Sequence, residues 1–291
     1  MSDFRGWRWG VGMTLAATVG LAAAWVGGKR EAQRIQFRQL DLMLPHLPPA
    51  FDGYKIAHLT DIHLDGTPAA EARLARAVAW INAAQPDAIA LTGDFVTLKL
   101  PGDTGALIAH LRTLRAPDGV FAVMGNHDHK RHRYMVEGVL KAAQIHHLAN
   151  AIHPLRRDDA LLTLCGVDSM SRRRARLDRV LSALNRAARE QGDAAGQPCA
   201  ILLAHEPDFA DIAAPTRRFD LQLSGHAHGG QIRIPFVTPR FLPIYGERYS
   251  NGLYLVQRMM VYSNRGLGTT GIPIRFRCPP EVTVITLHAR A

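Results

Sequence analysis

Short apolar runs, each about as long as a buried strand, alternate with segments of helical periodicity along most of this chain. Between the first two runs, Leu74, Val78 and Ile81 recur at the spacing that places side chains on one face of a helix. This alternation predicts an α/β layered fold. From residue 259 on the pattern is strand-rich, which predicts that the sheet is mixed or doubled. The runs cover residues 55–60, 88–92, 120–124, 161–167, 200–204, 221–223, 259–262 and 282–287.

Polar residues with metal-binding chemistry follow five of these runs. A single histidine after a strand is most often a hydrogen-bonded loop residue, but a sheet gains nothing from five polar ends in register. Ligands of open α/β sheets bind outside the carboxyl ends of the strands, so we expect these segments to form one site. Glycines precede several of the polar residues and let the backbone turn sharply. The segments are Asp61-Ile62-His63, Gly93-Asp94, Gly125-Asn126-His127-Asp128, His205-Glu206 and Gly225-His226-Ala227-His228.

The residue types in these segments suit a pair of metal ions. Imidazole and carboxylate ligands together select first-row ions such as Mn, Fe or Zn. No cysteine joins the segments, which excludes a structural cysteine-rich zinc site. Asp61 and His63 stand two residues apart, as do His226 and His228, so each pair shares one side of an extended segment. Two ions about 3.5–4 Å apart can clamp the oxygens of a phosphoryl group.

The order of these segments resembles the signature of the calcineurin-like metallophosphoesterases over residues 54–230. Further on, Gly229-Gly230-Gln231, the stretch 264–268 and Pro279-Pro280-Glu281 are similar to the bacterial membrane-associated branch that contains the YaeI and YkuE phosphodiesterases. The resemblance implies a layered α/β sandwich of mixed sheets flanked by helices. It also implies a metal-dependent phosphoric ester hydrolase, a phosphodiesterase, that uses two divalent ions, with Mn favoured over Fe or Zn.

The resemblance further implies a set of metal ligands, most of them imidazoles and carboxylates. A hydroxide that bridges the two ions would attack the phosphorus, since the metals lower the pKa of bound water. The implied ligands are Asp61, His63 and His228 for the first ion, Asn126, His205 and His226 for the second, and Asp94 as the bridge between the two.

Four residues are implied to act on the substrate or its leaving group. His127 would not be a ligand; it would protonate the leaving alkoxide or stabilise the charge there, with Asp128 holding its ring and raising its basicity. Asn126 would also contact the phosphate through its amide. Arg265 follows the strand that ends near residue 262, so it could reach the substrate phosphate at the same edge of the sheet.

The N-terminal region predicts a membrane anchor. From Trp9 to Gly28 the chain has no Asp, Glu, Lys or Arg, and as a helix this stretch would span about 30 Å, one hydrocarbon thickness. We predict a single-pass anchor over residues 1–30, with the transmembrane helix at about 9–28, then a connector over 31–50 and the phosphoesterase domain over 51–291. The alternative is a cleaved signal peptide, with Arg5 and Arg8 as its basic start.

Basic residues stand on both sides of the predicted span, so they leave its orientation open. The larger number after it, from Lys29 to Arg38, favours a catalytic domain on the cytoplasmic side of the bacterial inner membrane. The whole chain has 35 Lys and Arg against 25 Asp and Glu, a net charge of +10, which suits an anionic partner. With the anchor beside it, this charge favours a phosphate ester that is lipid-linked or part of the cell envelope.

Two other functions are compatible with parts of the sequence. A nuclease of the same superfamily fits the positive charge, but the anchor opposes it and no basic strip with interleaved aromatic residues is present, so we expect no nucleic acid partner. A non-catalytic scaffold on the same fold would have lost metal ligands, whereas every ligand position here holds a competent residue. The sequence leaves open the exact substrate, the native metal pair, the preference for diesters or monoesters, and the oligomeric state.

Overall fold

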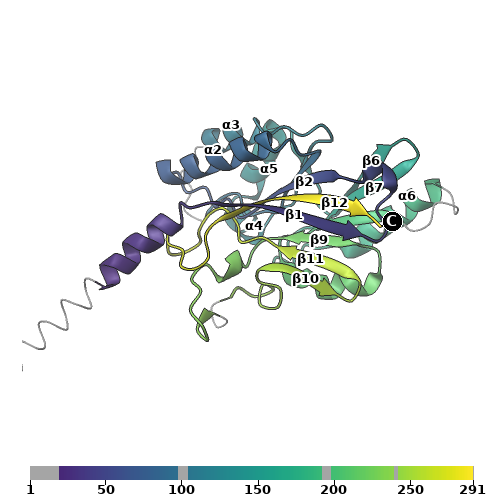
Figure 1. Cartoon of the computed structure of the whole chain (residues 1–291). Helices are drawn as coiled ribbons and strands as arrows, with labels where there is room; N and C mark the ends of the chain where they lie inside the picture. Colours follow the sequence, from purple (N-terminus) through teal and green to yellow (C-terminus); the bar gives the residue numbers. More distant parts are fainter. Residues whose placement is uncertain (1–19, 98–103, 192–197, 239–241, 291) are drawn as a thin grey trace, which may run out of the picture.

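Two six-stranded sheets packed face to face form the centre of the molecule (Figure 1). The structure, a computed structural model, describes residues 20–97, 104–191, 198–238 and 242–290. Apolar side chains from both sheets fill the space between them, among them Ile56 and Phe121 from the first sheet and Leu203 and Leu223 from the second. Both sheets combine parallel and antiparallel pairs, so the predicted α/β class with mixed sheets is confirmed.

The first sheet has the strand order β1-β12-β2-β3-β4-β5. Strands β2, β3 and β4 are parallel neighbours, whereas β12 runs antiparallel to β2. Helices α2, α3 and α5 lie on its outer face (Figure 1), where Leu74, Val78 and Ile81 of α2 are buried as their spacing predicts. The strands are β1 (Gln36–Leu44), β2 (Tyr54–Leu59), β3 (Ala88–Leu91), β4 (Val120–Ala122), β5 (His146–His147) and β12 (Glu281–Ala289), and the helices are α2 (Pro68–Ala83), α3 (Gly105–Leu111), α4 (Asn126–Arg131) and α5 (Arg133–Ala142).

The second sheet has the order β10-β11-β9-β8-β7-β6. Its four central strands are parallel, and β6 and β10 run antiparallel at its edges. Helices α6 and α7 pack on its outer face through side chains such as Val180 and Leu184 of α6 and Ala213 of α7. The strands are β6 (Ala151–Arg157), β7 (Ala160–Gly166), β8 (Cys199–Leu203), β9 (Leu221–Ser224), β10 (Gly252–Val256) and β11 (Met259–Ser263), and the helices are α6 (Leu177–Gln191) and α7 (Ala210–Ala213). Short 3-10 turns elsewhere in the domain are η1 (Pro49–Phe51), η3 (Pro207–Phe209), η4 (Ala214–Thr216) and η5 (His228–Gly230).

Strand β1 corrects the predicted connector over residues 31–50. Residues 36–44 pair in parallel with β12 along their whole length, from Gln36 opposite Glu281 to Leu44 opposite Ala289. Leu42 and Leu44 are buried between the sheets while the residues between and before them are more exposed, the alternation of a strand with one covered face. This part of the predicted connector therefore belongs to the first sheet, and the folded domain begins before residue 51.

A helix over residues 20–31 leads into β1, and its last turns are fastened to the segment before β12. The backbone N–H of Arg275 donates to the carbonyl of Gly28 at 3.0 Å, and that of Cys278 donates to Oε1 of Glu31 at 2.7 Å. Residues 9–19 of the predicted transmembrane helix lie outside the described residues. In the part of the chain that the structure describes, no helix is both long enough and apolar enough to cross a membrane.

Candidate metal centre

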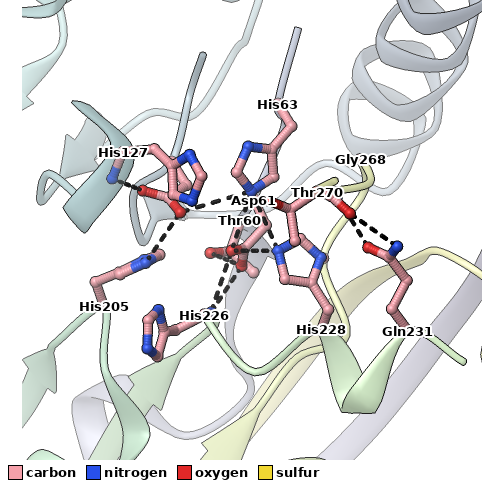
Figure 2. A network of polar contacts seen from close by, with 12 residues as sticks. Thr60, Asp61, His63, His127, His205, His226, His228, Gln231, Gly268 and Thr270 are labelled. Atoms are coloured by element: carbon pink, nitrogen blue, oxygen red, sulfur yellow. Dashed lines mark hydrogen bonds and ion pairs between the residues drawn. The ribbon is translucent and has the colours of Figure 1, made fainter. Parts of the chain in front are cut away.

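The carboxyl ends of five strands, three from the first sheet and two from the second, deliver the predicted ligands to one place. The site therefore straddles the edge where the two sheets meet, since ligands of open α/β sheets bind outside the carboxyl ends of the strands. Figure 2 shows the side chains from the two sheets turned toward one another. Strand β2 leads to Asp61 and His63, β3 to Asp94, β4 to Asn126, β8 to His205, and β9 to His226 and His228.

Asp61, His63 and His228 form the first group of potential ligands. Nε2 of His63 lies 3.1 Å from Nε2 of His228 and 3.8 Å from Oδ1 of Asp61. Nε2 of His228 lies 3.3 Å from the same carboxylate oxygen. Two ligands that each stand about 2.1 Å from one tetrahedral ion are about 3.4 Å apart, so these three atoms have the spacing of ligands to a single ion.

Asp94, His205 and His226 form a second group beside the first. Nε2 of His205 lies 3.3 Å from Oδ2 of Asp94 and 3.2 Å from Oδ1 of Asn126. The other ring nitrogen of His205 donates to the carbonyl of Thr92 at 2.7 Å, which orients Nε2 into the site. In His226 it is Nε2 that donates outward, to the carbonyl of Ile244 at 3.0 Å, and this leaves Nδ1 for a metal.

Asp94 stands between the two groups. Its Oδ2 is 3.3 Å from Nε2 of His205 and 3.5 Å from Nε2 of His63, which belong to different groups. Its other oxygen accepts the backbone N–H of His127 at 2.8 Å. This position is the one that a ligand shared by two ions requires.

The electrostatics of the cluster favour a bound cation. Burial lowers the pKa of His63 to about 3 and that of His228 well below its usual value, so both rings are neutral near pH 7, as metal ligands must be. Burial raises the pKa of Asp94, but the rings of His205 and His63 outweigh it and hold that pKa well below the usual range. Burial alone would lower the pKa of His205, yet Asp94 and Asp61 raise it well above its usual value.

Asp61 and Asp94 are buried carboxylates whose negative charge raises the pKa of His205. Imidazoles surround both carboxylates. Together they match the donor set of a first-row divalent ion. Among the described residues, the Nδ1 atoms of His63 and His228 have no hydrogen-bond partner, and their Nε2 atoms face each other at 3.1 Å with Asp61 beside them. The residues present therefore fit the two metal ions that the family pattern implies.

Several of the potential ligands have a strained backbone. A positive φ is uncommon outside glycine and costs on the order of 1–3 kcal/mol. Such strain clusters at functional sites because the surrounding structure holds it there. The strained ligands are Asp61 (φ 49°), His63 (φ 43°), Asp94 (φ 54°), His226 (φ 66°) and His228 (φ 50°).

Two glycines give the carboxylates the room they occupy. A Cβ atom at Gly125 would lie 2.1 Å from Oδ1 of Asp94, and one at Gly225 would lie 2.1 Å from Oδ2 of Asp61. Neither glycine has a positive φ, unlike Gly93 at +96°. The sequence predicts that these glycines permit sharp turns. At Gly125 and Gly225, however, glycine is needed because a ligand carboxylate approaches the backbone closely.

Asp128 does not contact the ring of His127, which corrects the predicted pairing. Its carboxylate accepts three backbone N–H groups, from Asp94 at 2.8 Å, Phe95 at 2.9 Å and Gly125 at 2.9 Å. Burial, with the charge of Asp94, raises its pKa to about 8. Asp128 therefore fastens the turn after β3 to the turn after β4, while Nδ1 of His127 is buried without a partner.

His127 itself lies at the cluster. Its ring stands edge-on to that of His63, with the ring centroids 4.9 Å apart and an interplanar angle of 85°. It also falls within a group of potential ligands with His63 and Asp94. Burial lowers the pKa of His127 below its usual value, against the charge of Asp94.

Arg265 is engaged away from the cluster, which corrects its predicted contact with the substrate. Its guanidinium donates to the carboxylate of Glu281 and to the side-chain oxygen of Gln36. It is also absent from the described residues that line the cavity over the cluster. Arg265 thus ties the loop after β11 to the starts of β12 and β1.

Arg275 is a residue that sequence reasoning missed. It is fully buried, and burial lowers its pKa to about 10. Its guanidinium donates to the carbonyls of Arg265 at 2.8 Å, Gly266 at 3.0 Å and Cys278 at 3.2 Å. The loop that it holds packs directly on the ligands, since a Cβ at Gly266 would lie 2.6 Å from Cβ of Asp61. A lone arginine in the sequence carries no signal of such a position.

A cavity of about 530 Å³ opens over the cluster. Asp94, Asn126, His127, His226 and His228 line it, together with a second set of residues between Gly230 and Ile272, which we call its second wall. In the second wall, Gln231 and the backbone of Thr270 bind each other (Figure 2). The potential metal ligands therefore make up only part of the lining that a substrate would meet.

Comparison with known proteins gives a consistent match. The profile of the family described as calcineurin-like phosphoesterase matches residues 54–230. The uncharacterized metallophosphoesterase YkuE of Bacillus subtilis is 35% identical over 84% of this chain and 82% of its own length. The phosphodiesterase YaeI of Escherichia coli is 28% identical over 80% of this chain and 82% of its own. A transmembrane protein with metallophosphoesterase domain from Danio rerio is 31% identical over 94% of this chain and 62% of its own length.

The close approach at Gly225 generates a prediction. In Gly225→Ala the new methyl group would displace Asp61, so we expect the affinity for Mn²⁺ to fall about 10- to 100-fold and stability to fall by about 1–3 kcal/mol. Calorimetric titration of the metal-stripped protein with Mn²⁺ measures the first, and thermal unfolding measures the second.

Gly138→Ala is the matched control, because a Cβ at this helical glycine of α5 meets no atom within 4 Å. We expect it to bind Mn²⁺ as the unchanged protein does. Unaltered affinity in Gly225→Ala would contradict the placement of Asp61 in the site.

Proposed function

Because the chain belongs to the calcineurin-like phosphoesterase family, we propose that it hydrolyses a phosphodiester or pyrophosphate bond at a pair of divalent ions. The observation that carries this proposal is the adjacency of the two ligand groups, with Asp94 within 3.5 Å of a histidine from each. A diester, rather than a monoester, is supported by the resemblance to a relative that is named a phosphodiesterase.

In this proposal Asp61, His63 and His228 would hold the first ion, Asn126, His205 and His226 would hold the second, and Asp94 would contribute to both. When bound, the ions would supply Lewis-acid chemistry, polarising the phosphoryl group and lowering the pKa of water. Imidazole, carboxylate and amide ligands accept Mn²⁺, Fe²⁺ and Zn²⁺ alike. Among these ions we propose Mn²⁺, which the family resemblance favours.

His127 and Asn126 act on the substrate in this proposal. Both line the cavity, so they can reach a phosphate ester that lies over the cluster. His127 supplies a proton to the leaving oxygen, and the amide of Asn126 donates to a phosphate oxygen. Asp128 acts indirectly, because its three backbone hydrogen bonds fix the two turns that carry Asp94, Asn126 and His127.

The activity and the roles of two histidines are tested together. We expect the purified protein with Mn²⁺ to hydrolyse bis-p-nitrophenyl phosphate and to lose this activity after metal removal by EDTA. His127→Ala should lower kcat about 100-fold or more and retain its metal, whereas His228→Ala should lose metal. Metal content and kcat are the measurements.

His288→Ala, at the exposed end of β12, is the matched control and should keep both activity and metal. If the protein shows no metal-dependent hydrolysis, the proposed activity is wrong. If His127→Ala loses its metal first, the role given to His127 is wrong.

We also propose that the N-terminal segment anchors the chain in the bacterial inner membrane. The helix over residues 20–31 exposes Leu21, Trp25 and Val26, and no charged residue occurs from Trp9 to Gly28. The name of the transmembrane relative from Danio rerio supports a membrane-bound form. The excess of basic residues after the span supports a cytoplasmic catalytic domain, and such a location suits a lipid-linked or cell-envelope phosphate ester.

Cell fractionation tests the anchor. The full chain should stay with the membrane through a carbonate wash, and a chain that starts at Gly27, which keeps the contacts of Gly28 and Glu31, should be released. Protease added to inverted membrane vesicles should digest the domain if it faces the cytoplasm. A full chain found in the soluble fraction, or a shortened chain that stays bound, would rule out this anchor.

A further inference from the structure

One wall of the cavity over the metal cluster is not explained by phosphate chemistry. Most of its larger side chains are apolar, and several are exposed: Ile272 is 51% exposed, Ile234 44% and Val237 39%. Ile232 and Pro243 add to this apolar surface. Exposed aliphatic side chains that gather beside a site of bond cleavage mark a binding surface, because leaving them in water is unfavourable.

Hydrogen bonds hold this wall in place. Oγ1 of Thr238 accepts the backbone N–H of Ile234 at 2.7 Å and donates to the carbonyl of Ile232 at 2.8 Å. The backbone N–H of Arg233 donates to the carbonyl of Phe276 at 2.9 Å, and that of Phe276 donates to the carbonyl of Gln231 at 3.0 Å. The two segments that make the wall are therefore joined to each other in a fixed arrangement.

The side-chain amide of Gln231 is bonded within the wall. The amide nitrogen of Gln231 donates to the carbonyls of Thr270 at 3.0 Å and Ile272 at 2.9 Å, and its oxygen accepts the backbone N–H of Thr270 at 2.9 Å. Both N–H groups of this amide are thus used within the wall and are not available to select a base or a sugar. Among the described residues of the wall there is also no aromatic ring on which a base could stack.

We infer that this wall binds the hydrocarbon part of an amphipathic phosphoester whose phosphate lies at the metal cluster. The inference rests on the proposed phosphodiesterase activity and specifies its substrate class. The cavity, at about 530 Å³, has the size of a site for a small ligand, roughly 300–1,000 Å³. Its lining combines the potential metal ligands with the aliphatic side chains of the wall, which suits a molecule with one charged and one apolar end.

The position of the N-terminal helix agrees with such a substrate. The segment that carries Ile272 continues into residues 274–278, which hold Gly28 and Glu31 of the helix. Figure 1 shows this helix leaving the domain beside that segment. A hydrocarbon chain that enters from the side of the proposed anchor would therefore meet the aliphatic wall first.

The test compares p-nitrophenyl esters of methyl, butyl and octyl phosphate, with the full-length protein and Mn²⁺ at one fixed detergent concentration. Water cleaves the bond to p-nitrophenol in each ester, so the alkyl phosphate is the second product and only the alkyl chain differs. Burial of one methylene group is worth about fourfold in kcat/KM at most (~0.8 kcal/mol). We expect kcat/KM to be about 100-fold higher for the octyl than for the methyl ester.

The double variant Ile234→Ser/Ile272→Ser should lower this octyl-to-methyl ratio about tenfold or more. Leu255→Ser is the matched control, because Leu255 of β10 is an exposed aliphatic residue outside the cavity, and its ratio should equal that of the unchanged protein. The ratio does not depend on how much of a variant is folded, since both esters are measured on the same sample.

A ratio near one in the unchanged protein, with bis-p-nitrophenyl phosphate hydrolysed, would overturn the hydrocarbon site and leave the phosphodiesterase activity standing. An unaltered ratio in the double variant would likewise overturn the placement of the hydrocarbon chain on this wall. Failure to hydrolyse bis-p-nitrophenyl phosphate as well would overturn the proposed activity itself.

Discussion

The carboxylate of Asp94, fully enclosed where the two sheets meet, is the group around which the site is organised. A buried carboxylate is costly unless hydrogen bonds and positive charge compensate it. The backbone N–H of His127 provides one hydrogen bond, and Gly125 leaves the space that the carboxylate fills. Histidines from both sheets surround its other oxygen. The remaining compensation is what a pair of divalent ions would provide.

The strained backbone at the ligands follows from the same constraint. The potential ligands follow the ends of separate strands, and the backbone must direct their side chains toward one common centre within two or three residues. Asp61 and His63 do so with a positive φ at each residue, and their N–H groups bond to the carbonyls of Gly93 and Asp94 in the neighbouring turn. Packing of the two sheets stabilises turns that the local sequence would not favour alone.

The sequence predicts the central strands and the residues that gather in the cluster, because both depend on local patterns. Apolar runs mark the central strands, and the potential ligands, from Asp61 to His228 in chain order, follow directly after the carboxyl ends of these strands. Strand β1 was missed although Leu40, Leu42 and Leu44 alternate in it, since prolines follow directly and its partner, β12, is more than 200 residues away.

The partners of Asp128, Arg265 and Arg275 could not be predicted, because each is set by tertiary packing. Asp128 meets N–H groups of a turn that lies 33 residues earlier in the chain, and Arg265 meets Gln36 of a distant strand. The aliphatic wall could not be predicted either, because in the sequence Ile234 and Ile272 look like ordinary core residues. Strand ends therefore supply the potential metal ligands, and in our proposal the later loops supply the selectivity.

The central claim is that one carboxylate joins two metal ions at the meeting edge of the sheets. Anomalous diffraction from crystals grown with Mn²⁺ tests it most directly. The account predicts two peaks about 3.5–4 Å apart, one among Asp61, His63 and His228 and the other among Asn126, His205 and His226, with the carboxylate of Asp94 touching both. A single peak, or two peaks of which only one contacts Asp94, would contradict it.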